Sequence, residues 1–561
     1  MHFSFFQQPY PSRRSPVLGL RGAVATSQPL AALAGIRMLL AGGNAVDAAI
    51  ATAAALTVVE PTSNGLGSDA FALVWDGHKL HGLNGSGRTP QALTPEVFAR
   101  RGLHQVPSEG WLPITVPGAI SAWVELAHRF GSMPLTEVLR PAIEYAEQGS
   151  PVSPVIAGYW KAAERRFRRW AEAGAPTDSS GDLVHPFSET FLVNGRAPRP
   201  GEVFRCPDLG RSLRLIAESK GEAFYRGGLA ERIASWAAAT GGFITRDDLA
   251  RHRAEWVEPI STSYRGFDIW EIPPNGQGLA ALMALNILEG FDMARLPHLS
   301  AHQLHLLIEA LKLSFADAYA YIADPAVASV PTEALLDKGY AQARRALIRQ
   351  PQTWRDDGEG EGGCLANPSP TPGLPQRADT VYLCTADGEG RLVSFIQSNY
   401  MGFGSGVVVP GTGISLQNRG ACFTLQEGHP NRLAPGKRPF HTIIPGFISR
   451  SGVPLAAFGV MGGDMQPQGH VQVVVGVVDY GLNPQAAIDA PRLRVLGGPA
   501  VALESVIPAE TARQLARWGH HVRVDPEMAG FGGGQMIWRD PESGVLIAGS
   551  EPRKDGAALA L

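Results

Sequence analysis

The sequence has few cysteines and no long apolar run. Its four cysteines, Cys206, Cys364, Cys384 and Cys422, lie far apart and form no CxxC pair. A disulfide framework or a cysteine zinc site needs closer spacing than this. The longest apolar stretch, near residues 48–59, is too short and too rich in Ala and Thr to span a bilayer. These absences exclude a disulfide-stabilised scaffold and a transmembrane protein.

An excess of charge of one sign is also missing. The chain has 49 Lys and Arg against 52 Asp and Glu, a net charge of −3, which gives no field to attract nucleic acid or an anionic membrane. Residues 1–16 lack the basic and apolar regions of a cleaved export signal, so we expect a cytoplasmic protein. Metal-ligand spacings are lacking too, and we therefore expect neither a metal nor a cofactor.

Glycine and proline are abundant, with 65 and 44 residues, and this favours many short elements joined by turns. Residues 30–40 and 45–59 are spaced as two packed helices. Asn44 is in position to cap the second helix, with Asp47 three residues later as in a capping box. That second helix is apolar on nearly all sides, so we expect it to be buried.

The character of the chain changes twice further along. Residues 115–350 are mostly helical in pattern, with one strand over 264–272. Residues 351–379 hold an Asp/Glu/Gly run and four prolines, a composition typical of a flexible, exposed segment. After residue 380 the chain is rich in strand patterns. Strands are predicted over 70–75, 381–385, 392–397, 407–410, 455–460 and 534–539, and helices from 469 to about 480 and from 484.

The start of this β-rich region places two hydroxyl groups together. The turn Asp387-Gly388-Glu389-Gly390 is typical of a hairpin. If the hairpin is centred on Glu389, Thr380 lies opposite Ser398, and directly opposed side chains are roughly 5 Å apart. A bulge would shift this register by one residue.

Thr380 has two interpretations. If the Asp379–Thr380 bond is cut, Thr380 gains a free α-amine that can act as the base for its own hydroxyl. Alternatively, Asp-Thr merely opens a strand. The glycine pair Gly462-Gly463, after a predicted strand, favours the first interpretation, because exposed backbone N–H groups suit an oxyanion hole. It could also be a plain turn.

Several segments, in order, resemble the gamma-glutamyltranspeptidase family of N-terminal nucleophile hydrolases. They include GNAVDAAIATAAALTVVEP, VPGAISAW, SYRGFDIWEIPP, APGKRP, NPQAAIDAPR and SEPRKDGAA. The resemblance implies an α+β fold, a four-layer αββα sandwich, made as a precursor that cuts itself. Residues 1–379 would then form a large subunit and residues 380–561 a small catalytic subunit, together one αββα unit. A dimer of such processed heterodimers is the expected assembly.

The same resemblance assigns roles to four residues. Thr380 is the expected nucleophile, and Asp379–Thr380 the cleavage site. Ser398 stands where the family has a Thr that contacts the nucleophile, in agreement with the hairpin arithmetic. Gly462 and Gly463 align with the glycines of the oxyanion hole.

The residues expected to bind substrate depart from the family pattern. An Arg that binds the α-carboxylate is replaced by Ser86, and the nearest arginine is Arg88. The other family positions carry Tyr400 for an Asn, Arg419 for a Glu or Gln, Cys422 for an Asp, and His441-Thr442 for a Ser pair.

A guanidinium where an ammonium should bind favours an anion instead. Arg419 is thus the expected ligand of a substrate carboxylate, with help from Arg88 and His441, unless it turns away and pairs with an acid. Tyr400 in place of Asn indicates a smaller pocket.

The leading hypothesis is a self-processing amidohydrolase that acts on a small anionic amide such as oxamate, through a threonyl acyl-enzyme. The string QSNYMGFGSGVVVPGTGI resembles the branch that contains oxamate amidohydrolase. Three alternatives stay open: a gamma-glutamyltransferase or glutathione hydrolase, a cephalosporin-acylase-like amidase with a larger apolar acyl site, and an unprocessed binding protein that kept the fold.

Overall fold

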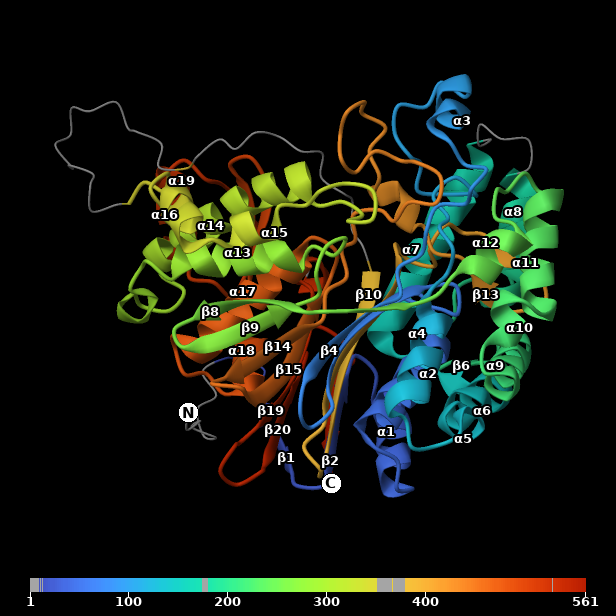
Figure 1. Ribbon diagram of the computed structural model, residues 1–561, viewed down its shortest axis with the longest axis horizontal. Helices are drawn as coiled ribbons and strands as arrows, with labels where there is room; N and C mark the ends of the chain where they lie inside the picture. The colour runs from blue at the N-terminus through green and yellow to red at the C-terminus, as the bar shows by residue number, and fades with distance from the viewer. Residues whose placement is uncertain are drawn as a thin grey trace.

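Two antiparallel sheets of seven strands lie face to face at the centre of the protein, and helices cover the outer face of each (Figure 1). The predicted four-layer αββα sandwich is therefore confirmed. The computed structural model describes residues 10, 12, 14–173, 180–350, 366, 379–526 and 528–561.

The first sheet has the strand order β21-β2-β10-β11-β3-β4-β7. In that order its strands span Ala557–Ala560, Gly22–Thr26, Asp379–Asp387, Leu392–Tyr400, Asp69–Trp75, Leu80–Asn84 and Glu255–Val257. The second sheet has the order β1-β20-β19-β15-β14-β9-β8. Its strands span Val17–Gly19, Leu546–Ser550, Gly533–Arg539, Val453–Met461, Gly446–Arg450, Phe267–Glu271 and Ile260–Tyr264. In both sheets, strands that precede residue 380 pair with strands that follow it.

The strands of the first sheet are buried on both faces because they lie between the second sheet and a helical layer. Alternate side chains point to opposite faces of a strand. In β10, Tyr382 belongs to the core between the two sheets, whereas Val381 and Leu383 pack on the helices. This explains why these strands are apolar almost throughout rather than alternating.

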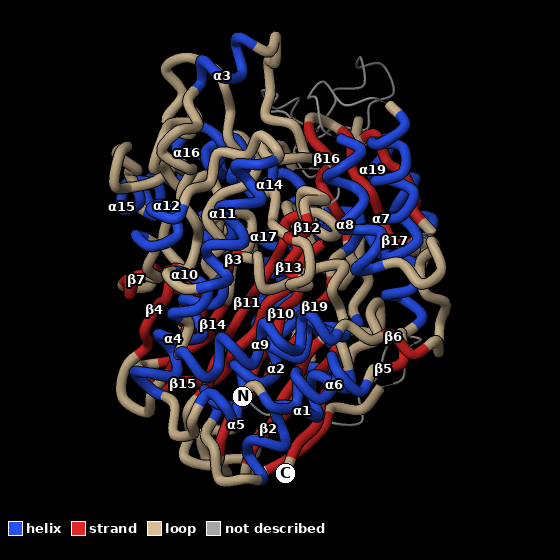
Figure 2. Tube along the Cα trace, turned by 90° about the vertical axis from the view of Figure 1, so that its right-hand side faces the viewer, coloured by secondary structure: helices blue, strands red, loops and turns tan. Residues whose placement is uncertain are grey.

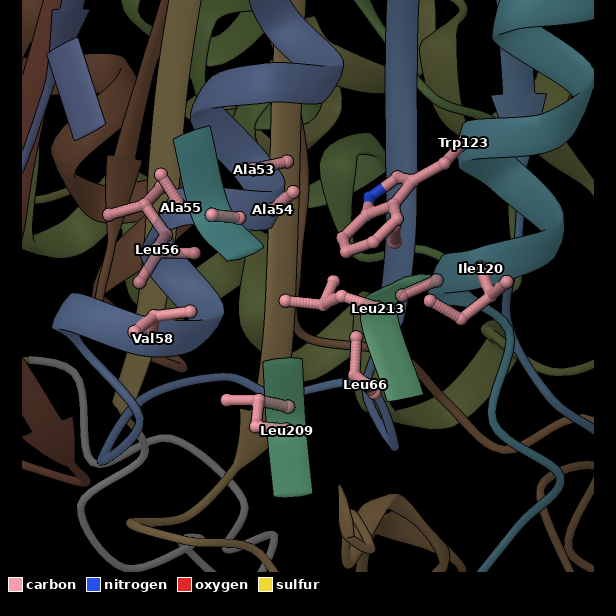
Figure 3. Close-up of a cluster of buried hydrophobic side chains, with 14 of the residues drawn as sticks. Ala53, Ala54, Ala55, Leu56, Val58, Leu66, Ile120, Trp123, Leu209 and Leu213 are labelled. Carbon is pink, nitrogen blue, oxygen red and sulfur yellow. The ribbon is translucent and has the colours of Figure 1, made fainter. Parts of the chain in front are cut away.

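One helical layer packs on the first sheet, and Figure 2 shows it in front of the strands. It contains α1 (Pro29–Leu40), α2 (Ala45–Val59), α4 (Ala119–Phe130), α6 (Arg140–Gln148) and α9 (Pro207–Ser219). Helix α2 is buried along its whole length. Its side chains meet those of α4 and α9 in Figure 3, where Trp123 and Leu213 lie beside the Ala-rich helix.

The other helical layer packs on the second sheet. It contains α13 (Gly278–Leu288), α14 (Ala301–Tyr321), α17 (Met465–Val478) and α18 (Pro484–Asp489).

Further helices are α3 (Pro95–Arg100), α5 (Leu135–Val138), α7 (Pro154–Glu172), α8 (Ser180–Phe191), α10 (Glu222–Tyr225), α11 (Gly228–Ala239), α12 (Arg246–Arg251), α15 (Thr332–Leu336), α16 (Lys338–Arg345), α19 (Ala509–Arg517) and the 3₁₀ turns η1 (Met293–Arg295), η3 (Arg419–Cys422) and η4 (Met528–Phe531). Small sheets are formed by β5 (Ser150–Pro151) with β6 (Val203–Phe204), by β12 (Val408–Val409) with β13 (Ile414–Ser415), and by β16 (Leu493–Gly497), β17 (Ala500–Glu504) and β18 (His521–Asp525).

The predicted cap of α2 is present. The Asn44 side chain accepts hydrogen bonds from the N–H groups of Val46 and Asp47, and the Asp47 side chain accepts one from Asn44 N–H at 2.9 Å. This reciprocal arrangement stabilises a helix start by about 1 kcal/mol.

Two predicted elements were wrong in their bounds. Residues 264–272 form not one strand but the ends of two, β8 and β9, joined by a turn at Arg265-Gly266 in which both residues have positive φ. The alternation of apolar residues continues through that turn and conceals it. Helix α17 begins at Met465, four residues earlier than predicted, because Pro467 lies in the first turn, where a missing N–H costs little.

The cysteines do not form a disulfide framework. Cys206, Cys384 and Cys422 are free thiols, and Cys364 lies outside the described residues. Residues 351–379, predicted to be a flexible segment, also lie outside them except for Ala366 and Asp379. No helix within the described ranges combines the length and apolar character that crossing a membrane requires.

Candidate active site

The hairpin formed by β10 and β11 has the predicted register. Val381 pairs with Gln397, which centres the hairpin on residue 389, and the register then shifts at Thr380, so that Asp379 pairs with Tyr400. The Thr380 hydroxyl lies 3.1 Å from the Ser398 hydroxyl, within hydrogen-bond distance. Thr380 is 2% exposed, and Ser398 is buried. The two hydroxyl groups that the sequence placed opposite each other are therefore in direct contact.

A carboxylate extends this pair into a row across three strands. Ser398 of β11 is paired with Asp69, the first residue of β3. Paired residues on neighbouring strands share a face, and this face is the one that meets the second sheet. Thr380, Ser398 and Asp69 are therefore neighbours on the inner face of the first sheet. The sequence analysis did not identify Asp69 as a site residue. Asp69 directly follows a predicted turn, and no local spacing links it to residue 398.

Arg419 is the first residue of the 3₁₀ turn η3 and is fully buried. Its Nη1 donates a 2.6 Å hydrogen bond to the Thr442 hydroxyl. Its Nε and Nη2 are buried and have no hydrogen-bond partner, and Arg419 forms no ion pair within the described part of the chain. Buried donors are normally satisfied, and an unsatisfied charged one is costly. Two N–H groups of the guanidinium are therefore available to a further acceptor.

Tyr400 and Cys422 form one wall beside Arg419. The Arg419 guanidinium carbon lies 4.5 Å from the centre of the Tyr400 ring, a cation–π contact. Tyr400 has φ of +76°, in the left-handed region, and its N–H donates to the Ser398 hydroxyl at 2.8 Å. Burial raises the pKa of Tyr400 and that of Cys422. A bulky residue held in this strained conformation connects the Thr380–Ser398 pair to Arg419.

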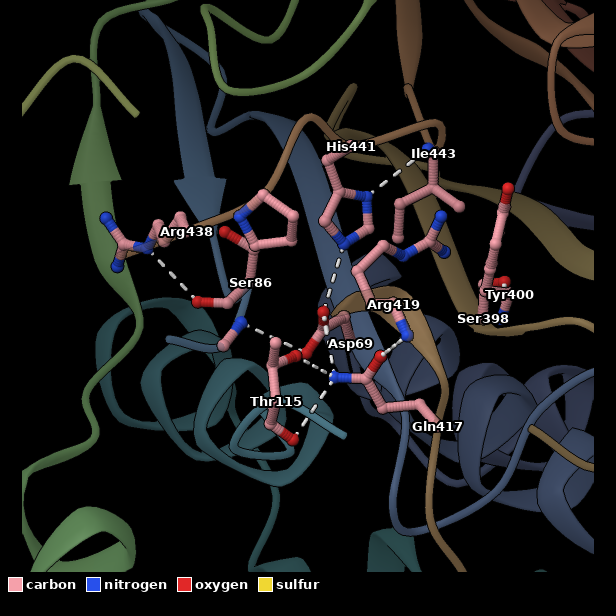
Figure 4. A network of polar contacts seen from close by, with 12 residues as sticks. Asp69, Ser86, Thr115, Ser398, Tyr400, Gln417, Arg419, Arg438, His441 and Ile443 are labelled. Atoms are coloured by element: carbon pink, nitrogen blue, oxygen red, sulfur yellow. Dashed lines mark hydrogen bonds and ion pairs between the residues drawn. The ribbon is translucent and has the colours of Figure 1, made fainter. Parts of the chain in front are cut away.

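His441 lies on the other side of Arg419, as Figure 4 shows. Its Nε2 is 3.0 Å from Asp69 Oδ2, and both side chains are fully buried. Burial, reinforced by Arg419 and Arg438, lowers the pKa of His441, so the ring is neutral. Burial raises the pKa of Asp69 to about 7, against the opposing effect of the Arg419 guanidinium.

The glycine pair ends strand β15 ahead of helix α17. Gly462 and Gly463 have φ of +122° and +60°, values that favour glycine. Their N–H groups make no hydrogen bond within the described residues. Gln277 ties this turn to the rest of the site, because its Nε2 donates to Gly463 O at 2.9 Å and to Thr442 O at 2.6 Å.

A continuous path of contacts therefore joins most of the predicted residues. It runs from Thr380 through Ser398, Tyr400, Arg419, Thr442 and Gln277 to Gly463. Arg88 is engaged differently. It forms ion pairs with Asp324 at 3.1 Å and with Glu255 at 3.2 Å, on a side chain that is 34% exposed.

Asp464 is a second acid that sequence reasoning missed. It follows the glycine pair and is 5% exposed, and its Oδ1 is buried without a hydrogen-bond partner. Burial raises its pKa to about 7. Its charge acts on Tyr400 and Cys422, so it faces the same wall of the site. Its position directly after Gly463 was the available signal.

One cluster among the described residues has the composition of a metal site. His305 and Glu309, one turn apart on α14, meet His520, with ligand atoms within 4.8 Å of one another. However, Lys312 Nζ lies 2.6 Å from Glu309 Oε1 and is itself buried. An ion would have to displace that ammonium group, and we assign no metal here.

If Thr380 is the nucleophile, as the sequence predicts, activity should survive metal removal, because a hydroxyl nucleophile with a nearby base needs no Lewis acid. Dialysis against a strong chelator should leave the turnover rate of an amide substrate unchanged. Zinc or manganese added afterwards should restore nothing. Loss of activity that a metal ion reverses would contradict a metal-free mechanism.

Comparison with known proteins agrees with this geometry. The sequence profile described as Gamma-glutamyltranspeptidase matches residues 31–561. The chain is 39% identical to the glutathione hydrolase-like YwrD proenzyme of Bacillus subtilis, over 97% of this chain and 99% of that protein. It is 36% identical to the oxamate amidohydrolase proenzyme of Klebsiella pneumoniae, over 96% and 98% of the two chains. Among solved structures, cephalosporin acylase from Bacillus halodurans is 53% identical, with a TM-score of 0.89 and coverage of 100% and 99%.

Proposed function

The chain belongs to the gamma-glutamyltranspeptidase family, and on that premise we propose that it is a self-processing amidohydrolase whose nucleophile is Thr380. The observation that supports this most is the 3.1 Å contact between the Thr380 and Ser398 hydroxyl groups, at the start of a buried strand. The precursors among its relatives support a chain that yields two subunits, residues 1–379 and 380–561.

The first reaction in this proposal is cleavage of the precursor. Thr380 Oγ attacks the carbonyl carbon of Asp379, and the peptide C–N bond breaks as the nitrogen takes up a proton. The product is an ester between Asp379 and the Thr380 hydroxyl, with a free α-amine on Thr380. Water then hydrolyses the ester and leaves a carboxylate on Asp379.

The second reaction uses the new amine. The Thr380 α-amine accepts the proton of Oγ as Oγ attacks the substrate carbonyl. The N–H groups of Gly462 and Gly463 stabilise the oxyanion, an effect of about 3–4 kcal/mol per donor. The proton then passes to the leaving amine, and water hydrolyses the threonyl ester. Ser398 holds Thr380 Oγ in the attacking position.

We propose that the acyl group of the substrate carries a carboxylate. The two open N–H groups of buried Arg419 support this, since a carboxylate can accept from both. Thr442 and the Tyr400 ring fix the guanidinium, while His441 and Cys422 line its surroundings. Arg88 is left out of this binding role because Asp324 and Glu255 already pair with it.

Two other kinds of amide substrate are each supported by a separate observation. The identity of 53% to a cephalosporin acylase supports the alternative of an amidase with a larger, more apolar acyl site than oxamate needs. A γ-glutamyl group would need an acid for its ammonium, and Asp464, with its unpartnered Oδ1, is the acid in position to supply it.

A panel of three substrates distinguishes these possibilities. The purified enzyme is offered oxamate, a glutaryl amide and a γ-glutamyl anilide, and release of ammonia or amine is measured. Hydrolysis of oxamate or of the glutaryl amide alone would support an anionic acyl site of small or larger size. Preferential hydrolysis of the γ-glutamyl anilide, whose acyl group carries an ammonium beside its carboxylate, would overturn a site for an acyl group whose only charge is a carboxylate.

Ser398→Ala is expected to lower kcat by about tenfold or more with little change in KM. A hydrogen bond to the nucleophile is worth roughly 1–1.5 kcal/mol, and more when charge develops. Steady-state kinetics on the best panel substrate measures the effect. Ser394→Ala is the matched control, because Ser394 lies on the same face of β11 and contacts Tyr382 instead. An unchanged kcat in Ser398→Ala would remove Ser398 from the mechanism.

A further inference from the structure

We propose that Asp69, together with His441, is a positioning pair that takes up one proton when a carboxylate binds to Arg419. The inference rests on the proposed function in one respect, that Arg419 binds the acyl carboxylate. It adds a residue that the sequence did not single out and a dependence of substrate binding on pH.

The geometry places Asp69 at the centre of the site. It lies next to Ser398 across the strand pair, and its Oδ1 accepts a hydrogen bond from Gly87 N–H at 3.1 Å. Its Oδ2 accepts from Gln417 Nε2 at 3.3 Å and lies 3.0 Å from His441 Nε2. Gln417 in turn accepts from the backbone N–H of Arg419 at 2.7 Å. Asp69 therefore contacts His441 directly and is connected to the Arg419 backbone through Gln417 (Figure 4).

The charges facing Asp69 come from several elements. Arg419 and Arg438 act on it as cations, and its charge acts on the buried Tyr225 hydroxyl. Arg438 already pairs with Glu255 at 2.9 Å. His441 is neutral. Next to Asp69 there is thus one guanidinium without an ion pair in the described part of the chain, Arg419, so these two groups are close to electrical balance. The second buried acid, Asp464, acts on the wall formed by Tyr400 and Cys422.

A bound substrate carboxylate upsets this balance. It brings a second negative charge into a buried space that holds one guanidinium, and a nearby like charge raises the pKa of a carboxyl group. Asp69 is the acid placed to respond, because it contacts His441 and Gln417 beside Arg419 and burial raises its pKa to about 7. Burial raises the pKa of Asp464 to about 7 as well, and a proton taken up there would persist in Asp69→Asn. A proton on Asp69 leaves Arg419 to the substrate and still allows a hydrogen bond with the neutral His441.

The sign of the pH dependence follows. Above about pH 7 the free Asp69 is ionised, so binding takes up a proton, and affinity for the anion falls as pH rises, by at most tenfold per pH unit. Below about pH 7 Asp69 is already protonated in the free enzyme, and affinity becomes level. With Asp69→Asn no proton is taken up, and affinity should be level throughout.

Calorimetry of the mature enzyme measures the proton directly. Oxalate and glutarate, the acyl products of the two anionic amides in the panel, are titrated at pH 8 in phosphate and in Tris, whose ionisation enthalpies differ. The difference in binding heat gives the number of protons taken up. We expect close to one for the unmodified enzyme and close to zero for Asp69→Asn. Asp76→Asn is the matched control, because Asp76 follows the same strand and pairs with His81 at 2.9 Å, and it should behave as the unmodified enzyme.

The outcomes separate this inference from the function it rests on. If neither dianion binds, or if Arg419→Gln binds them as well as the unmodified enzyme does, the anionic acyl site fails and this inference fails with it. If a dianion binds through Arg419 with no proton uptake, only the inference fails. The unmodified enzyme alone decides that point, so it does not depend on the folding of Asp69→Asn. Uptake that persists in Asp69→Asn would place the proton elsewhere and overturn it.

Discussion

Thr380→Ala should remain a single chain of 561 residues, whereas the unmodified protein should separate on a denaturing gel into chains of 379 and 182 residues. The variant lacks the oxygen that attacks the Asp379 carbonyl, and without cleavage the nitrogen of residue 380 stays an amide, which cannot act as a base. Amide hydrolysis should fall to the level of the uncatalysed reaction. Mass spectrometry of the two fragments identifies the new N-terminal residue.

Two further variants make this result specific. Thr380→Ser keeps a hydroxyl group and should still be cleaved. Thr385→Ala is the matched control, because Thr385 lies on the same strand but donates its hydrogen bond to Ala45 O. It should be cleaved normally. Cleavage of Thr380→Ala, or a fragment that begins at another residue, would show that Thr380 is not the nucleophile.

Arg419→Gln should raise KM for an anionic amide by about 10- to 150-fold, because a hydrogen bond to a charged group is worth roughly 1.5–3 kcal/mol. The precursor should still be cleaved, since its own scissile bond needs no carboxylate ligand. Kinetics with the anionic amide, next to an uncharged amide of similar size, measures the selective loss. The uncharged amide should be affected far less.

Arg88→Gln is the informative comparison for Arg419. Its guanidinium pairs with Asp324 and Glu255 rather than facing Tyr400, so its effect on KM should be much smaller. Equal effects of the two substitutions would mean that general positive charge, not the open donors of Arg419, attracts the substrate. An unchanged KM in Arg419→Gln would contradict the anion-binding role of Arg419 and favour the γ-glutamyl hypothesis instead.

Local signals in the sequence predicted a good part of the site. The register of the hairpin up to Val381 follows from its turn, and it brings the Thr380 hydroxyl to that of Ser398 although the register shifts at Thr380 itself. The burial of α2 follows from its apolar faces and its cap. The anion hypothesis for Arg419 came from residue types at family positions, and the geometry adds the two open N–H groups that it needed.

The site residues that the sequence did not predict depend on contacts between segments that are far apart in the chain. Asp69 and His441 are 372 residues apart in the chain and meet only because β3 and the loop before β14 face each other across the two sheets. The ion pairs of Arg88 with Glu255 and Asp324 also join segments that are far apart in the chain, and Glu255 is brought near by the pairing of β4 with β7 in one sheet. The periodicity of apolar residues cannot predict such contacts, because a period of two or of 3.6 residues describes a single strand or helix.

The order of strands in the two sheets constrains how such a protein is made. In the first sheet β2 lies between β21 and β10, and in the second β1 pairs with β20 and β9 with β14. A cut before Thr380 would thus produce two polypeptides that both contribute strands to each sheet. Neither polypeptide could dissociate without breaking backbone hydrogen bonds along whole strands. Folding must then come before cleavage, and the cut protein should melt as a single unit. Separately produced halves would each expose unpaired strand edges, which invite aggregation rather than reunion.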